Sequence, residues 1–198
     1  MTAAPSPRCA RVVELSADQL RGRLAEALQI YVDAMGYPPA TTQQRAPMWS
    51  AHMLRPGWRC VGAFTGENDL VGIAYGYSGL PGQWWHEQVR RGMLAAGLEA
   101  AAEDWLTDYF ELTELHVRPG SQAGGLGESL LRRLLDGADA DKVLLSTPEG
   151  PTRAWKLYRR VGFVDVLRNY RFTGDPRPFA VLGSPLPLHV RAAHPPNS

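Results

Sequence analysis

The sequence has few cysteines, almost no net charge and no long apolar run. Its two cysteines, Cys9 and Cys60, lack the spacing of metal ligands, so we expect reduced thiols in a cytoplasm and no metal site. The 21 basic and 20 acidic residues leave a net charge of +1, which argues against a nucleic-acid partner or a polybasic membrane anchor. No apolar run reaches the roughly 20 residues of a membrane-spanning helix, and the first residues do not resemble a secretory signal. These absences predict a cytoplasmic protein without a nucleic-acid or membrane partner.

The composition predicts one folded domain. Hydrophobic residues make up 44% of the 198 residues, enough for a substantial core despite 20 glycines and 16 prolines. We expect a single domain over residues 11–188, flanked by flexible tails at residues 1–10 and 189–198. No residue pattern fixes the oligomeric state, and a homodimer is among the expected partners.

Hydrophobic periodicity predicts a mixed succession of helices and strands. In the first half we expect a strand at 11–15, a helix over 20–32 capped by Ser16, a helix over 41–54 capped by Thr41 or Thr42, and a hairpin of strands 58–65 and 70–77. Residues 79–109 predict an insertion of one or two amphipathic helices. We then expect strands at 112–117 and 142–146, helices at 126–135 and 154–161, and closing strands at 163–172 and 178–182, the last at a sheet edge because of its prolines.

The most informative stretch is residues 111–135, which read as a strand, a glycine-rich loop and an amphipathic helix. Glycines in the loop let the backbone turn tightly, and the first amides of a helix have no partner within it, so this stretch suits a phosphate or pyrophosphate. Gly125-Leu126-Gly127 lacks the third glycine of a dinucleotide fingerprint and the lysine of a nucleotide P-loop. A plain turn that starts a helix remains the competing interpretation of the loop alone.

Two motifs resemble those of the GNAT acyltransferases. Gln122, Gly125 and Gly127 match the Q/R-x-x-G-x-G/A loop of that family. About thirty residues later, residues 154–163 (AWKLYRRVGF) resemble its A-x-x-L-Y-x-x-x-G-F segment. The resemblance covers residues 111–172 well and the first half by its order of elements. It implies an α/β fold with a central mixed, mostly antiparallel sheet of six to seven strands, flanked by helices and carrying a helical insertion between the third and fourth strands.

The resemblance also implies a function and a donor. It implies an N-acyltransferase that moves an acetyl or short acyl group from acetyl-CoA to an amine of a small molecule or a peptide by direct attack on the thioester. The residues expected to bind acetyl-CoA are Leu115, His116, Val117, Gln122, Ala123, Gly124, Gly125, Leu126, Gly127, Glu128, Thr152, Ala154 and Tyr158. The family often carries an asparagine where this chain has Pro151, which offers neither a side-chain donor nor a backbone N–H, so Thr152 or a backbone group is expected to replace that contact.

Acyl transfer needs an acid and a base. Tyr158 is the candidate acid for the departing thiolate, because a phenol has a reference pKa near 10 and a thiol one near 8.5; a core tyrosine is the alternative. Glu111 is the first candidate base and Glu114 the second, with His116 or water as further alternatives. Strict alternation along the strand would put the two glutamates on opposite faces.

The 79–109 insertion supplies the remaining candidates. Trp84, Trp85 and His86 are expected to line the pocket for the acceptor, since insertions near a site often act as walls or lids. Packing of these aromatics onto the domain is an equally weighted interpretation. Two rival functions stay open: a non-catalytic acyl-CoA sensor or scaffold of the same fold, and a nucleotide-binding protein of unrelated class.

Overall fold

The computed structural model describes residues 10–66, 68–122 and 124–188. Its contacts cluster into two compact units. The first combines the chain up to Ser78 with Glu111–Asp139, and the second combines Gly79–Phe110 with the chain from Ala140 onward. Of the tails expected at 1–10 and 189–198, residues 1–9 and 189–198 lie outside the described residues, and the single domain expected over 11–188 stays a prediction. No helix among the described residues is long and apolar enough to cross a membrane.

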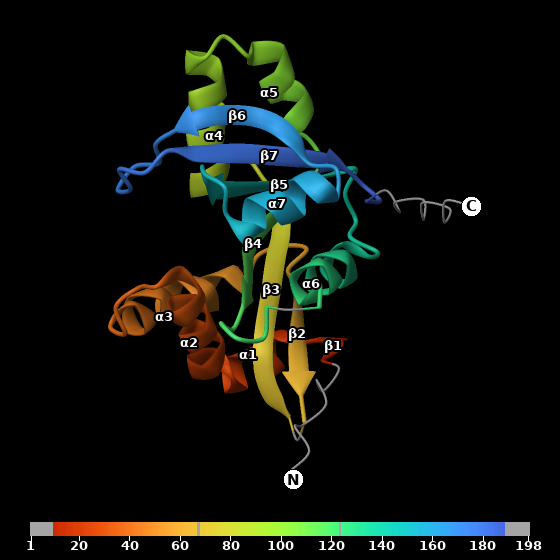
Figure 1. The fold of residues 1–198 in the computed structure, drawn as a ribbon. Helices are drawn as coiled ribbons and strands as arrows, with labels where there is room; N and C mark the ends of the chain where they lie inside the picture. The colour runs from red at the N-terminus through yellow and green to blue at the C-terminus, as the bar shows by residue number, and fades with distance from the viewer. Residues whose placement is uncertain (1–9, 67, 123, 189–198) are drawn as a thin grey trace, which may run out of the picture. The chain divides into compact units, whose positions relative to one another are not determined.

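Seven strands of the described residues form one sheet, which confirms the predicted fold class. Their order is β1-β2-β3-β4-β5-β7-β6 (Figure 1), and β1 with β2, β2 with β3, β5 with β7 and β6 with β7 pair antiparallel. The strands are β1 (Arg11–Glu14), β2 (Arg59–Thr65), β3 (Asp69–Gly79), β4 (Tyr109–Val117), β5 (Lys142–Pro148), β6 (Val164–Tyr170) and β7 (Phe179–Pro185). The helices are α1 (Ala17–Gly22), α2 (Leu24–Met35), α3 (Thr41–His52), α4 (Trp84–Ala95), α5 (Glu99–Trp105), α6 (Leu126–Leu135) and α7 (Arg153–Arg160).

The helical start of the first unit differs in detail from the prediction. Ser16 caps α1 as expected, within a capping box completed by Gln19. The single helix expected over 20–32 is two helices, because Arg23 leaves helical geometry (φ −120°, ψ 15°) between α1 and α2. The caps expected from Thr41 or Thr42 are wrong: Ala40 is the N-cap of α3, and the Thr42 hydroxyl donates instead to the Pro39 carbonyl.

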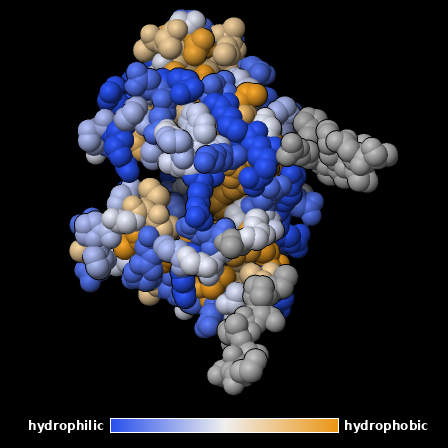
Figure 2. Space-filling view, viewed as in Figure 1, coloured by the Kyte–Doolittle hydropathy of each residue, from blue (hydrophilic) through white to orange (hydrophobic). Residues whose placement is uncertain are grey.

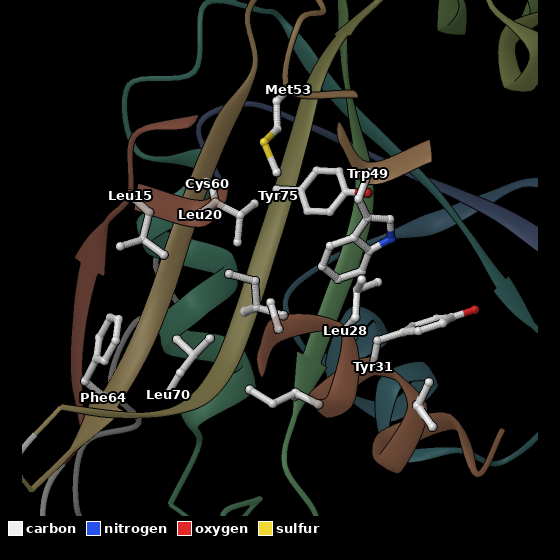
Figure 3. Packing of buried hydrophobic residues seen from close by; sticks show 14 of the residues in the cluster. Leu15, Leu20, Leu28, Tyr31, Trp49, Met53, Cys60, Phe64, Leu70 and Tyr75 are labelled. Carbon is white, nitrogen blue, oxygen red and sulfur yellow. The ribbon is translucent and has the colours of Figure 1, made fainter. Parts of the chain in front are cut away.

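An aromatic-rich core holds α1, α2 and α3 against β2 and β3. Leu20, Ile30, Trp49, Leu70 and Ile73 are fully buried in it, and the Trp49 ring meets the Tyr75 ring edge-on at 5.0 Å (Figure 3). Burying an aromatic side chain removes about 150–250 Å² from water, so this cluster dominates the stability of the unit. The α6 helix buries the predicted leucine face, Leu126, Leu130, Leu131, Leu134 and Leu135.

The second unit contains the predicted insertion as two helices, α4 and α5, which form a hairpin (Figure 1). Trp105 anchors the hairpin on β7, since a Cβ at Gly183 would lie 2.5 Å from the Trp105 ring. The edge expected at 178–182 is wrong. β7 pairs with β5 on one side and β6 on the other, so β6 is the edge strand.

Candidate active site

Glu111 is a carboxylic acid buried in the first unit. It lies on β4, is 3% exposed, and accepts a hydrogen bond from the Tyr77 hydroxyl of β3 at 2.9 Å through Oε1. Its other oxygen, Oε2, is buried and has no hydrogen-bond partner among the described residues. A buried acceptor without a partner costs about 1–3 kcal/mol, so the fold bears a penalty for keeping this oxygen available.

Burial also makes this carboxyl unusually basic. Loss of solvation raises the pKa of Glu111 from 4.5 to about 7, against the opposing effects of the Tyr77 hydrogen bond and the Arg55 charge. Arg55 lies over the Tyr77 ring at 4.5 Å, so it holds the same tyrosine that holds the carboxyl. A carboxyl with a pKa near neutrality can exchange a proton at physiological pH.

The second candidate base, Glu114, is paired with a histidine. Its Oε2 lies 2.5 Å from Nε2 of His116, and both side chains are largely buried. The His116 ring in turn meets the Tyr31 ring of α2 edge-on, with 5.0 Å between the centroids. Burial, followed by the nearby Glu114 charge, raises the pKa of Tyr31 to about 12, so this phenol stays protonated.

Both glutamates are connected to one aromatic cluster, Glu111 directly and Glu114 through His116, which strict alternation along β4 would prevent. Glu111 bonds to Tyr77, and Glu114 is linked through His116 to Tyr31. These rings belong to a continuous set of neighbours on the side covered by α2 and α3, namely Tyr31, Trp49, Tyr75, His52 and Tyr77. The strand therefore departs from a strict two-residue period between the two carboxylates.

Four members of this cluster, Trp49, His52, Tyr75 and Tyr77, are not among the residues predicted from the sequence. The His52 ring nitrogen Nδ1 lies 3.0 Å from the Tyr75 hydroxyl, and its ring lies 5.1 Å from that of Tyr77. Burial lowers the pKa of His52 to about 4, which keeps the imidazole neutral. The Tyr75-Gly76-Tyr77 spacing was the available signal, because it places two phenols on one face of a strand.

The glycine-rich loop is open where an anion was predicted. Gly124 and Gly125 have φ of +79° and +77°, and a Cβ on either would meet no atom within 4 Å. Gly125 is the N-cap of α6 and gives that helix no side-chain cap. Gln122 supports the loop by donating from Nε2 to the Val117 carbonyl at 3.1 Å. The predicted residue Ala123 lies outside the described residues.

Five further residues predicted to contact acetyl-CoA lie on β4 and at the start of α6. Leu115 and Val117 are partly buried on β4. Glu128, in the first turn of α6, pairs with Arg132 one turn later at 2.9 Å, which offsets its negative charge near the helix start. Leu126 packs with the α6 apolar face, and Gly127 follows it in the first turn.

In the second unit, Thr152, Ala154 and Tyr158 belong to α7 and its start. Thr152 is the N-cap, and its Oγ1 accepts from the Trp155 amide at 3.1 Å, so one lone pair of this hydroxyl is already used. Ala154 is partly buried. Tyr158 is buried, with its ring 5.4 Å from that of Phe163. The role of each toward acetyl-CoA stays a prediction.

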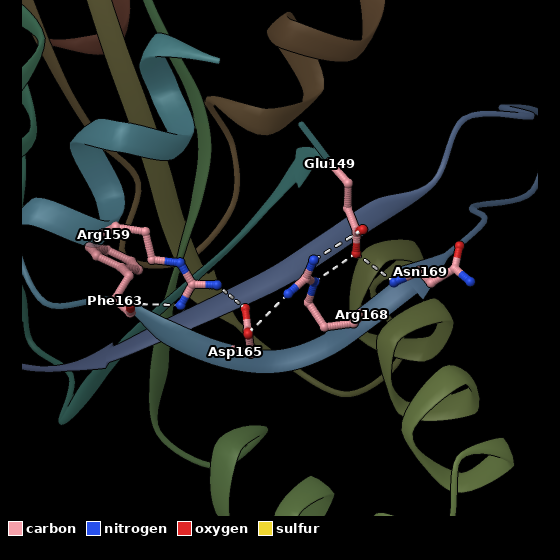
Figure 4. Close-up of polar contacts among 6 residues, drawn as sticks. All are labelled: Glu149, Arg159, Phe163, Asp165, Arg168 and Asn169. Carbon is pink, nitrogen blue, oxygen red and sulfur yellow. Dashed lines mark hydrogen bonds and ion pairs between the residues drawn. The ribbon is translucent and has the colours of Figure 1, made fainter. Parts of the chain in front are cut away.

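A charged network fixes the loop that leads into α7. Arg168 donates two hydrogen bonds to the Glu149 carboxylate, at 2.7 and 3.2 Å, and a third to Asp165 at 3.1 Å (Figure 4). The amide of Asn169 donates to the same Glu149, and these bonds lower the pKa of that carboxyl. Arg159 also pairs with Asp165. Bidentate geometry gives this network more directional strength than a single surface ion pair has.

The three predicted acceptor residues lie at the start of α4. Trp85 donates from its indole nitrogen to the Ser146 hydroxyl at 3.0 Å, and His86 lies 3.1 Å from the Tyr109 hydroxyl through Nδ1. Both are buried within their own unit, and burial lowers the pKa of His86. Trp84 is 54% exposed and faces Phe172 at 5.8 Å. An acceptor-binding role for them stays a prediction.

A curated relative matches almost the whole chain. The chain is 46% identical over 202 aligned residues to the GCN5-like protein acetyltransferase of Mycobacterium tuberculosis, an alignment that covers 89% of this chain and 98% of the relative. The chain belongs to the GNAT acetyltransferase family. The family resemblance inferred from the two motifs is therefore confirmed, and with it an N-acetyltransferase of the GNAT type. No protein-family model matches the chain.

Solved GNAT structures share the fold at low sequence identity. The alanine N-acetyltransferase of ribosomal protein S18 from Escherichia coli aligns with a TM-score of 0.60 and 16% identity, over 94% of this chain and 99% of its own. A protein from Salmonella typhimurium, described as an acetyltransferase, was solved with its cofactor acetyl-CoA. It aligns with a TM-score of 0.61 and 15% identity, over 93% of this chain and 98% of its own. These likenesses confirm the GNAT fold of this chain.

Proposed function

We propose that this GNAT acetyltransferase transfers an acetyl group from acetyl-CoA directly to a primary amine, with Glu111 as the base that removes the amine proton. One observation carries the proposal: the buried carboxyl of Glu111 keeps an oxygen that no described residue hydrogen-bonds, and burial raises the pKa of this carboxyl to about 7. A first choice of acceptor is an amine of a protein or peptide, since the Mycobacterium tuberculosis relative is named a protein acetyltransferase. A small-molecule amine is the second choice.

The residues of the glycine-rich loop fit acetyl-CoA. Open space at Gly124 and Gly125 and the uncapped start of α6 leave room for backbone amides to face a pyrophosphate. Acetyl-CoA supplies an acetyl group activated as a thioester, whose carbon–sulfur bond breaks as the new carbon–nitrogen bond forms. The Salmonella typhimurium protein with the same fold was solved with acetyl-CoA, which supports this choice of donor.

Glu111 would lower the cost of making the acceptor nucleophilic. An alkylammonium has a pKa near 10.4, and only the neutral amine has the lone pair needed for attack. Raising the pKa of the base from 4.5 to about 7 reduces the uphill proton transfer by about 3 kcal/mol, at roughly 1.4 kcal/mol per pKa unit. In this mechanism the proton moves from the amine nitrogen to Oε2, while Oε1 stays bound to Tyr77.

Three further groups would serve the same reaction. Glu114 carries the other carboxylate of the cluster, and a negative charge beside the Tyr31 ring attracts a cationic amine before it loses its proton. Tyr158 is proposed as the acid that gives a proton to the thiolate leaving group, as the family motif implies. The Val117 amide is proposed to polarise the thioester carbonyl.

A combined binding and turnover experiment tests the proposal. Calorimetry measures acetyl-CoA binding, and free-thiol release measures turnover with a lysine peptide, a peptide with a free N-terminus and a small alkylamine. We expect Glu111→Gln to bind acetyl-CoA as the wild type does and to lose turnover, while Glu14→Gln, at an exposed site on β1, keeps both. Heat on acetyl-CoA addition without thiol release from any amine would favour the sensor function. Protection by ATP or NAD instead of coenzyme A would contradict the donor.

A further inference from the structure

The α4–α5 hairpin carries an exposed apolar tip. The tip consists of the last residues of α4, the connecting turn and the start of α5, namely Leu94, Ala95, Ala96, Gly97, Leu98 and Ala100, all exposed. Leu94 is 37% and Leu98 36% exposed. Figure 2 shows orange and tan residues gathered at the top, where Figure 1 places the hairpin turn. Contiguous exposed apolar surface in a folded protein commonly marks an interaction site.

The packing of the second unit does not use this tip. Trp85, Val89 and Met93 form the buried side of α4, and Ala102 and Leu106 continue it on and beyond α5. Leu94 directly follows the buried Met93 and points away from that side, because successive helical residues are about 100° apart. The hairpin is therefore apolar on an inner side that the unit covers and on an outer end that it leaves in solvent.

Charges of opposite sign flank the tip on the two arms of the hairpin. Arg90 and Arg91 are exposed on α4, and Glu99 and Glu103 are exposed on α5. Among the described residues none of these four side chains takes part in an ion pair. By contrast, the neighbouring Asp104 carboxylate lies 3.6 Å from the Lys142 amine. An apolar centre with a basic arm and an acidic arm is complementary to itself.

We propose that the hairpin tip binds a second copy of this chain in a two-fold arrangement. In an isologous contact the same patch serves both partners, so the basic arm of one copy meets the acidic arm of the other and the leucines meet at the axis. Small residues at the turn allow close approach of the two backbones. The proposal is independent of the catalytic proposal, because none of the tip residues belongs to the aromatic cluster around Glu111.

The tip is small, which sets the expected strength of the dimer. A standard interface uses roughly 20–30 residues a side, about two to three times as many as the tip and its four charged neighbours provide. We therefore expect a reversible dimer with a dissociation constant in the micromolar range. Each charge contact occurs twice in a two-fold dimer, so reversing one charge disturbs two contacts at once.

Sedimentation equilibrium of the full chain over a wide concentration range measures the dimer. We expect Leu98→Glu to abolish it, and Arg91→Glu or Glu99→Arg alone to weaken it at least tenfold. The double variant Arg91→Glu/Glu99→Arg should return to within about threefold of the wild type, because it restores opposite charges. Leu54→Glu, at an 80% exposed leucine after α3, is the control and should leave the dimer unchanged.

Three results would overturn the proposal. The first is a wild-type chain that stays monomeric up to millimolar concentration. The second is a dimer that survives Leu98→Glu in a variant whose melting temperature equals that of the wild type. The third is a double charge variant no better than its single parents. The proposal would also be overturned if the monomer bound lipid vesicles through the same leucines, because the tip would then contact a membrane and not a second copy.

Discussion

Replacing Glu111 by glutamine tests the central site in two independent ways. The side chain keeps its shape, and the amide oxygen can still accept the hydrogen bond from Tyr77, but the group can no longer ionise. The variant therefore removes a base and removes a buried charge without opening a cavity. Activity and stability should change in opposite directions.

The stability effect follows from the raised pKa. The folded chain holds the Glu111 proton up to about pH 7, whereas an unfolded chain releases it near 4.5. Between these values the folded state binds more protons, so the free energy of unfolding of the wild type falls as pH rises through that window. The difference between a pKa of 4.5 and one of about 7 corresponds to about 3 kcal/mol. Glu111→Gln has no such loss. The free energy of unfolding of the variant minus that of the wild type should therefore increase by about 3 kcal/mol from pH 4 to pH 8.

The catalytic effect follows from the same raised pKa of Glu111. A general base typically contributes about 10²–10⁴-fold, so we expect kcat/KM to fall by that factor at pH 8. In the wild type the pH profile of kcat/KM should rise with a midpoint near 7, where the carboxyl loses its proton. That rise should disappear in Glu111→Gln, because the remaining rate no longer depends on this ionisation.

Urea unfolding at several pH values and thiol-release kinetics on the same preparations measure both effects. Glu114→Gln is the matched comparison: it removes the neighbouring carboxylate of β4, whose charge is the smallest of the effects on the pKa of Glu111, so the rise of kcat/KM should persist and move slightly to lower pH. A Glu111→Gln variant that keeps full activity would refute the base. A stability difference that does not change with pH would refute the buried, basic carboxyl itself.

Three further predictions concern other parts of the chain. Tyr77→Phe removes a hydrogen bond that lowers the pKa of Glu111, so the rising limb of the kcat/KM profile should move to higher pH. Gly125→Ala should raise KM for acetyl-CoA, whereas Gly36→Ala, with a similar positive φ at the end of α2, should cost similar stability, about 1 kcal/mol, and leave KM unchanged. Arg168→Met should lower the free energy of unfolding by about 0.5–1 kcal/mol, measured by urea titration, since its partly exposed ion pairs are screened by solvent.

Features set by neighbours in sequence could be predicted. The five leucines of α6 fall on one helical face because their spacing matches the helical period, and Ser16 caps α1 because its hydroxyl reaches the Gln19 amide three residues later. The loop motif and the order of elements also follow from local residue types. Each of these required no knowledge of what packs against the segment.

Features set by distant neighbours could not be predicted. Glu111 is basic because the surrounding core excludes water from it, and its hydrogen-bond partner Tyr77 lies 34 residues earlier in the chain. The residue pattern of β4 does not predict this hydrogen bond, because the partner lies on another strand. The prolines near β7 suggested an edge, yet Pro178 precedes the strand and Pro185 ends it, so the residues between them pair on both sides.

The aromatic cluster links the stability of the first unit to its proposed chemistry. Trp49, Tyr75 and Tyr31 supply the apolar surface that holds α2 and α3 in place, and the same rings remove water from the neighbourhood of both carboxylates. Trp49 keeps its indole nitrogen buried without a hydrogen-bond partner among the described residues, as does Glu111 its second oxygen. A core built only for stability would give both groups a hydrogen-bond partner. Changes that loosen this packing should therefore rehydrate Glu111, lower its pKa and weaken it as a base, even where no altered residue touches the acceptor.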